Sequence, residues 1–157
     1  MLSTILSASE IKKAVADGEI VIDPFDETNL KPASYTFTLG ECVRTVEPVR
    51  SVVIDSRAEP KFREFKIEED GHVFGPSAFA VFQTKEKLQL GENIACFLSM
   101  RGKCVQIGID ALRSEIFCEP GSKGGWDGRL MLETSFGALV RLFPGIPIVK
   151  AVFFRVA

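Results

Sequence analysis

The chain has 157 residues, a formal net charge of −2 and 46% hydrophobic residues. This length is typical of one domain, so we expect a single domain over residues 1–157 with a full hydrophobic core. With 19 basic and 21 acidic residues, the chain lacks the basic field of a nucleic-acid coat, and we expect no nucleic-acid partner. It contains no run of 18 apolar residues, and its start, MLSTILSASE, has no export signal. We therefore expect a cytoplasmic protein that has no membrane span.

The cysteines and the histidine do not predict a metal site. The sequence has only one histidine, His72, and its four cysteines are scattered without a CxxC pair, at Cys42, Cys96, Cys104 and Cys118. A zinc site needs clustered Cys and His ligands, and the HxE and PCxxC pattern of zinc-dependent deaminases is absent. We expect no bound metal at such a site, and reduced, buried thiols.

The first predicted element is a helix near the N-terminus. Ser7 and Glu10 have the spacing of a capping box, apolar residues follow at helical intervals, and Gly18 is a natural stop. Three segments follow in order: a short strand at 20–22, a proline-bounded loop at 23–32, and an alternating strand, SYTFTL, at 34–39 that ends at Gly40.

The middle of the chain has weaker patterns. Pro48 interrupts β-forming residues within 43–54, which predicts two short strands, and the charged stretch 57–70 is typical of a surface excursion. Further strands are predicted at 79–84 and 88–90 around a charged turn, at 93–100 as a nearly all apolar and therefore buried strand, at 139–142 and at 148–156. Roughly ten short strands with one N-terminal helix predict a mostly β fold, a β-barrel or a jelly-roll sandwich.

The stretch from Gly108 to Ser135 carries the most distinctive pattern, GIDALRSEIFCEPGSKGGWDGRLMLETS. A strand leads into a Pro-Gly turn and a glycine-rich loop, and the chain returns as a second strand over 129–134. Glu133 lies at the end of this return strand among apolar residues. A poorly solvated carboxylate suits proton transfer, whereas a carboxylate at a solvated edge would have no such role.

The order and spacing of these motifs resemble the dCTP deaminase family, which shares a superfamily with trimeric dUTPase. The segments that carry the resemblance, from about Leu6 to Arg155, are SASEIKKAVADGEIVIDPFDETNLKPASYTFTLG, FGPSAFAVFQTKEKLQLGENI, the EPG turn, LMLE, LFPGIPI and VFFR. The resemblance implies a distorted, dUTPase-like jelly-roll β-barrel with a short N-terminal helix. It also implies a homotrimer that binds a pyrimidine deoxynucleoside triphosphate at the boundaries between its subunits.

The resemblance assigns roles to particular residues. Glu133 takes the position of the general base that activates water for attack at C4 of cytosine, which implies a zinc-free deamination of dCTP to dUTP and ammonia. Met131 and Leu132 take positions where the family offers backbone contacts to the nucleotide. Glu119 replaces the family's aspartate that holds the deoxyribose 3′-hydroxyl, and a strand over 110–118 would form the base pocket. The deamination needs no cofactor by this resemblance, which allows Mg²⁺ bound with the triphosphate.

The phosphate-binding motif departs from the family pattern of Gly-Arg-Ser-Ser, two spacer residues and Arg. Here the stretch reads MRGKCVQ, so Arg101 keeps the first arginine position. Gly102 and Lys103 replace the two serines, and Gln106 replaces the second arginine. Gly102 lets backbone N–H groups approach an anion and Lys103 adds a charge, so the stretch can still bind phosphate. The alternative is a turn at a strand end with solvated cations.

Two further departures concern the surroundings of the nucleotide. Thr36 replaces the aspartate of the family's SYD motif. The chain ends at Ala157, where family members continue with a glycine-rich tail that folds over the nucleotide, and without this lid we expect weak water exclusion and weak contacts to the γ-phosphate. The loop over 122–127, with Lys123 and Trp126, is a candidate substitute, although a tryptophan more commonly packs against a neighbouring wall or subunit.

The sequence leaves three functions open. The first is deamination of dCTP, with Glu133 as the base and Arg101 and Lys103 on the phosphates. The second is a dUTPase-like pyrophosphatase, in which Mg²⁺ bridges the phosphates and Glu119 positions water on the α-phosphate. The third is a non-catalytic relative that binds or regulates with a degenerate site. Glu133 favours the first function, whereas the lost aspartate, serines and arginine favour the third.

Overall fold

The computed structural model describes residues 4–46, 53, 55–76 and 78–157. Its helices are α1 (Ala8–Ala16), the 3₁₀-helix η1 (Glu27–Asn29) and α2 (Gly102–Gln106). Its strands are β1 (Thr4–Ile5), β2 (Ile20–Asp23), β3 (Leu30–Lys31), β4 (Ser34–Val46), β5 (Phe62–Lys66), β6 (His72–Phe74), β7 (Phe79–Leu90), β8 (Ile94–Met100), β9 (Ile109–Asp110), β10 (Phe117–Cys118), β11 (Arg129–Phe136), β12 (Val140–Leu142) and β13 (Pro147–Arg155).

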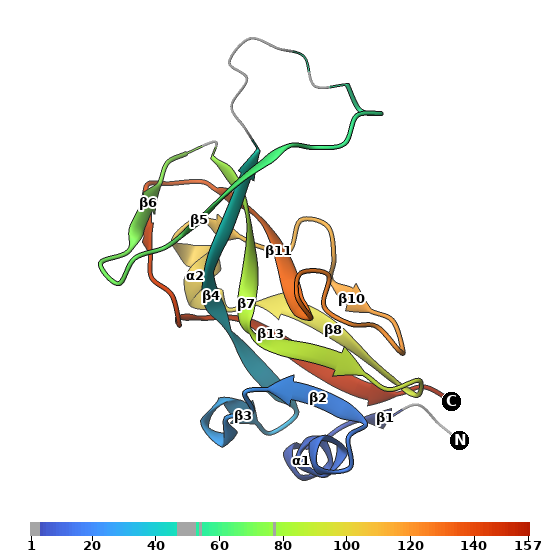
Figure 1. The fold of residues 1–157 in the computed structure, drawn as a ribbon. Coiled ribbons are helices and arrows are strands. Elements are labelled where there is room, and N and C mark those ends of the chain that lie inside the picture. The colour runs from blue at the N-terminus through green and yellow to red at the C-terminus, as the bar shows by residue number, and fades with distance from the viewer. Residues whose placement is uncertain (1–3, 47–52, 54, 77) are drawn as a thin grey trace.

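One curled antiparallel sheet forms most of the molecule (Figure 1). Its main path runs β10-β8-β13-β4-β7-β11-β9, while β1 joins β13, β2 joins β7, and β3 and β5 join β4. The long strands β4 and β7 lie in the middle of the sheet, where it curls. β4 pairs with β13 along its first half and with β7 and β5 along its second half. The mostly β architecture with a short N-terminal helix, as predicted from the sequence, is confirmed.

The capping box predicted for the first helix is present. The Ser7 Oγ accepts the Glu10 N–H at 3.4 Å, and the Glu10 carboxylate accepts the Ser7 N–H at 2.8 Å. Ile11 and Ala14 are buried against the core, and Gly18 has a φ of +76°, which L side chains rarely adopt. The helix therefore begins and ends where the sequence predicts.

Gly40 does not end its strand, contrary to the sequence-based prediction. β4 continues through Gly40 to Val46 beside β7, and a Cβ atom at position 40 would lie 2.8 Å from the carbonyl oxygen of Gln83. Glycine is required here because the neighbouring strand approaches closely, and not because the chain turns.

β7 is one continuous strand, so the charged turn predicted between residues 84 and 88 is wrong. The charged residues alternate in this stretch: Lys85 and Lys87 are exposed, while Glu86 is buried. The Glu86 carboxylate accepts the Thr38 N–H at 2.9 Å and the Thr38 hydroxyl at 2.6 Å. A buried carboxylate is tolerated when hydrogen bonds compensate it, and these bonds connect β7 with β4.

Other predictions need smaller corrections. β8 was predicted to be buried, but Phe97 is 52% exposed, on the outer face of the sheet. The stretch 57–70 is largely exposed as predicted, but it contains β5, which pairs with β4. Residues 43–46 continue β4, whereas the predicted break at Pro48 lies outside the described residues.

The hydrophobic core is built from buried residues of α1 and of the strands. It contains an aromatic cluster in which the rings of Phe74 and Phe136 stack at 4.9 Å and Phe82 meets Phe74 edge-on at 5.3 Å. Phe136 is the last residue of β11, and Phe82 of β7 is paired in register with the fully buried Leu132. β11 is thus held on a packed surface. Within the described part of the chain, no helix is long and apolar enough to cross a membrane.

Candidate active site

Glu133 lies on β11, with its carboxylate fixed by a neighbouring loop. Along β11 the buried residues alternate with half-buried ones, and Glu133 is one of the half-buried residues. Its carboxylate oxygen Oε2 accepts a hydrogen bond from the Ser114 hydroxyl at 2.8 Å. The side chain is therefore neither deeply buried nor freely solvated, and its orientation is set by Ser114.

The segment that supplies Ser114 is not the strand predicted over 110–118. Only Ile109–Asp110 and Phe117–Cys118 are strands, and the residues between them form an irregular loop. This loop lies alongside β11 and is hydrogen-bonded to it. The Arg113 N–H donates to the Glu133 carbonyl at 3.4 Å, and Arg113 Nη1 donates to the Ser135 hydroxyl at 3.0 Å. The consecutive polar residues Arg113-Ser114-Glu115 are the sequence signal that this segment leaves the regular strand pattern.

Glu115 brings a second carboxylate close to Glu133. Glu115 lies in an exposed part of the loop, but neighbouring atoms partly desolvate its carboxyl group. This desolvation raises the pKa of Glu115, and repulsion from the Glu133 carboxylate raises it further. A pair of carboxyl groups of which one retains its proton more readily can both accept and supply protons. Sequence reasoning singled out neither Ser114 nor Glu115.

The other predicted residues of this half of the site lie on both sides of the glycine-rich loop. Glu119 is exposed, and its carbonyl accepts the Ser122 N–H at 3.1 Å in the Pro-Gly turn. Met131 is half-buried and lines a small cavity that Glu115 also lines. Leu132 is fully buried, so neither its side chain nor its backbone is exposed within one chain. The nucleotide contacts of these residues remain predictions.

The glycine-rich loop folds back onto the sheet through Trp126. The indole is 4% exposed, and the Arg44 guanidinium carbon lies 3.8 Å from its ring centroid. The Gly124 N–H donates to the Leu88 carbonyl at 3.1 Å, which connects the loop to β7. The predicted packing of Trp126 against a neighbouring wall is confirmed, and the wall belongs to β4 of the same chain.

Two of the four phosphate-motif residues line a different cavity, of about 410 Å³. Arg101 follows β8, where its N–H donates to the Ile148 carbonyl at 3.0 Å. Arg101 and Gly102 line the cavity, with Lys31, Ser34, Thr36, Met100 and Lys150. Lys103 and Gln106 are exposed on α2 and do not line it. Sequence reasoning missed Lys31 and Lys150 because they are distant from the motif in the chain.

Within one chain, these two groups of residues do not form a single site. The cavity at Arg101 lies in the half of the sheet formed by β8, β13 and β4, whereas Glu133 lies on β11 beyond β7. The Arg101 cavity and the small cavity beside Glu115 share no lining residue. Glu133 lines neither of these two cavities, so the general-base candidate lies apart from the cavity at Arg101 within one chain.

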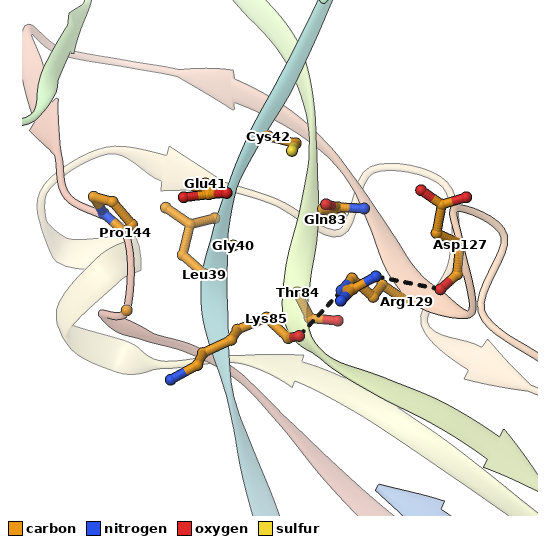
Figure 2. A pocket seen from close by; sticks show the side chains of 11 residues that line it. Leu39, Gly40, Glu41, Cys42, Gln83, Thr84, Lys85, Asp127, Arg129 and Pro144 are labelled. Atoms are coloured by element: carbon orange, nitrogen blue, oxygen red, sulfur yellow. Dashed lines mark hydrogen bonds between the residues drawn. The ribbon is translucent and has the colours of Figure 1, made fainter. Parts of the chain in front are cut away.

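A third cavity, of about 590 Å³, lies between β4, β7 and the start of β11 (Figure 2). Figure 2 shows Arg129 held at its edge, where Nε donates to the Lys85 carbonyl at 3.1 Å and Nη1 to the Asp127 carbonyl at 3.4 Å. Charges of both signs line this cavity, including Glu41. None of the site residues predicted from the sequence lies in it.

Comparisons with known proteins identify the family of this chain. The model of the family described as dCTP deaminase-like matches residues 5–156. A "dCTP deaminase, dUMP-forming" of Methanobrevibacter smithii is 29% identical over 157 residues, which cover 95% of this chain and 79% of the relative. A "dCTP deaminase" of Rhodopirellula baltica is 28% identical over 156 residues, covering 98% of this chain and 73% of the relative.

A solved structure, that of 2′-deoxycytidine 5′-triphosphate deaminase from Agrobacterium tumefaciens, has a similar fold. It superposes with a TM-score of 0.76 over 99% of this chain, at 15% sequence identity. The chain spans about half of that protein, since the match covers 49% of its length. The dUTPase-like fold class predicted from the sequence is confirmed, in the form of a curled sheet.

Proposed function

We propose that this chain, which belongs to the dCTP deaminase-like family, deaminates dCTP by hydrolysis. The observation that carries the proposal is the position of Glu133, whose carboxylate is held at 2.8 Å by the Ser114 hydroxyl beside a second carboxyl group, Glu115. A general base must be held within hydrogen-bonding reach of the proton that it accepts, and a fixed carboxylate meets that requirement.

The proposed reaction assigns a role to each of these groups. Glu133 accepts a proton from water while the water oxygen bonds to C4 of cytosine. Glu133 passes this proton to N3 of the ring, and the exocyclic amine receives a proton and leaves as ammonia. The proton left on the C4 hydroxyl returns to the group that protonated the amine, as C4 becomes the carbonyl carbon of uracil. Ser114 positions the base, and Glu115, whose pKa is raised by desolvation and by Glu133, is the group suited to supply a proton to the leaving amine. The balance is dCTP plus water giving dUTP plus ammonia.

A second candidate product is dUMP. It is favoured by the name of the relative from Methanobrevibacter smithii, which is a dUMP-forming dCTP deaminase. In this case the deaminated nucleotide would also lose diphosphate, which is the chemistry that the sequence suggested for Glu119. One site would then carry out two hydrolyses on the same nucleotide, one that releases ammonia and one that releases diphosphate.

A product analysis tests both candidates. The protein is incubated separately with dCTP, dUTP, CTP and dCMP, the nucleotides are resolved chromatographically, and ammonia and diphosphate are measured. We expect dCTP alone among the cytosine nucleotides to yield a uracil nucleotide, with one ammonia for each conversion. Release of diphosphate in equal amount would identify dUMP as the product. Unchanged dCTP would contradict both candidates and favour the non-catalytic alternative.

We infer that the complete site forms between copies of the chain in a homotrimer. The separation of Arg101 from Glu133 supports this inference, since a neighbouring copy can bring the two halves together. An exposed aromatic cluster on the outer face of the sheet also supports it: Phe97 lies 5.0 Å from Phe117 and 5.4 Å from Phe154, measured between ring centroids. Exposed apolar surface of this kind is typical of a subunit interface.

Replacing Phe97 by aspartate is expected to break the assembly. A charge at this position would have to be desolvated in an apolar contact, which is unfavourable. Light scattering during gel filtration should give three times the chain mass of 17.3 kDa for the wild type and a smaller mass for Phe97→Asp. Leu139→Asp is the control, because Leu139 is also exposed, at 74%, and lies outside the aromatic cluster. A wild-type protein with the mass of one chain would refute the shared site.

We also propose a cytoplasmic location. All four cysteines are free, although Cys96 and Cys118 are paired in register across β8 and β10. Unpaired thiols are typical of a reducing compartment. Cell fractionation with an antibody against the protein would test this location.

A further inference from the structure

The cavity at Arg101 carries more positive charge than the sequence motif indicates. Lys31, Arg101 and Lys150 all line it, from three separate parts of the chain. Its volume of about 410 Å³ is within the usual range of small-ligand pockets. The structure thus adds two lysines to the one motif arginine that lines the cavity.

Strand pairing explains why these residues meet. Lys150 of β13 is directly opposite Thr36 of β4, and Lys31 of β3 is directly opposite Ser34 of β4. Residues opposite each other in antiparallel strands share a face, as do residues two apart in one strand, such as Ser34 and Thr36. The two lysines and the two hydroxyl residues therefore lie on the same face of the sheet, beside the end of β8.

The charges of this cavity are not compensated within the described part of the chain. There, no carboxylate lies within ion-pair distance of Lys31, Arg101 or Lys150. The Lys31 ammonium donates only a long hydrogen bond, of 3.5 Å, to the Thr28 carbonyl. No lining residue is acidic, because position 36, which is an aspartate in the family motif, is threonine. Such a cavity is suited to a multiply charged anion.

The same residues do not fit a bound Mg²⁺ ion. Magnesium in phosphate sites is held by carboxylates together with phosphate oxygens and water. The described residues include no group of three or more His, Cys, Asp or Glu side chains that could hold a metal ion. Three cationic side chains around one cavity would also repel a divalent cation.

We propose that Lys31 and Lys150 bind the phosphate chain of the nucleotide together with Arg101, so that this subsite takes an oligophosphate directly, without a bridging divalent cation. The lysine ammonium groups supply charge and hydrogen-bond donors where the family motif would supply serine hydroxyls and a second arginine. That the anion is part of dCTP rests on the proposed function, whereas binding of the phosphate chain can be tested by itself.

Calorimetric titration with inorganic tripolyphosphate and with dCTP tests the proposal. Both ligands are titrated in EDTA and again in excess Mg²⁺. We expect both to bind in EDTA, and Mg²⁺ to leave binding unchanged or to weaken it. Lys31→Gln and Lys150→Gln should each weaken both ligands about tenfold, the value of one charge-assisted contact. Lys150→Arg, which keeps the charge, should retain most of the binding.

Lys61→Gln is the matched control, since Lys61 is exposed and does not line the cavity. Tripolyphosphate binding that depends on the two lysines, in a protein that leaves dCTP unchanged, would support the subsite and contradict the deaminase function. Efficient deamination of dCTP with no effect of either lysine substitution would support the function and overturn the subsite. Loss of binding of both ligands in EDTA would also overturn it.

Discussion

Glu133→Gln is expected to abolish turnover of dCTP while leaving its binding within about tenfold of the wild type. The base acts mainly in the transition state, so its loss lowers kcat far more than affinity. A positioned base contributes about 10²- to 10⁴-fold, and we expect a fall in kcat in this range. The glutamine carbonyl can still accept the Ser114 hydroxyl, which bonds Glu133 at 2.8 Å, so the local geometry should be retained. The measurements are ammonia release at saturating dCTP and calorimetric titration.

Glu92→Gln is the matched control for this change, because Glu92 is an exposed carboxylate outside the loop and strand of the candidate site. It should leave both kcat and dCTP affinity unchanged. Wild-type activity in Glu133→Gln would remove Glu133 from the mechanism. A Glu133→Gln protein that fails to fold, as judged by circular dichroism, would instead identify Glu133 as a structural carboxylate.

Binding of dCTP is expected to be weak and strongly dependent on salt. Relative to the family motif, the chain lacks two serine hydroxyls and one arginine and has gained Lys103. Each charge-assisted contact contributes about 1.5–3 kcal/mol, so the motif by itself has lost a few kcal/mol, or on the order of a hundredfold in affinity. Lys31 and Lys150 offset part of this loss. We expect dissociation constants in the range of tens of micromolar or weaker.

Salt distinguishes this binding mode from one that rests on buried contacts. The Debye length is about 10 Å at 0.1 M and about 3 Å at 1 M salt, so attraction to exposed cations is screened over this range. Titrations at low and high salt should differ at least about tenfold in dCTP affinity. Submicromolar binding that is insensitive to salt would indicate that the glycine-rich loop around Trp126 has rebuilt the site. No binding of any pyrimidine nucleotide to the folded trimer would favour the non-catalytic alternative.

The sequence by itself determined the features that depend on local patterns. The Ser7–Glu10 capping box, the stop at Gly18 and the strand that carries Glu133 were all predicted, because side-chain hydrogen bonds and apolar periodicity act over a few residues. The family resemblance, which depends on the order of such motifs, predicted the fold class that the structure has.

Only the tertiary structure decided the features that depend on strands distant in the chain. Gly40 resembles a strand stop in the sequence, but it is required by the approach of β7. Ser114 reaches Glu133 because their loop and strand fold against each other, and Lys31 meets Lys150 because both flank β4. Such meetings are set by strand register, and no local sequence pattern records the register between distant strands. The proposed base is therefore visible in the sequence, whereas the serine that orients it and the charges proposed to bind phosphate are visible only in the fold.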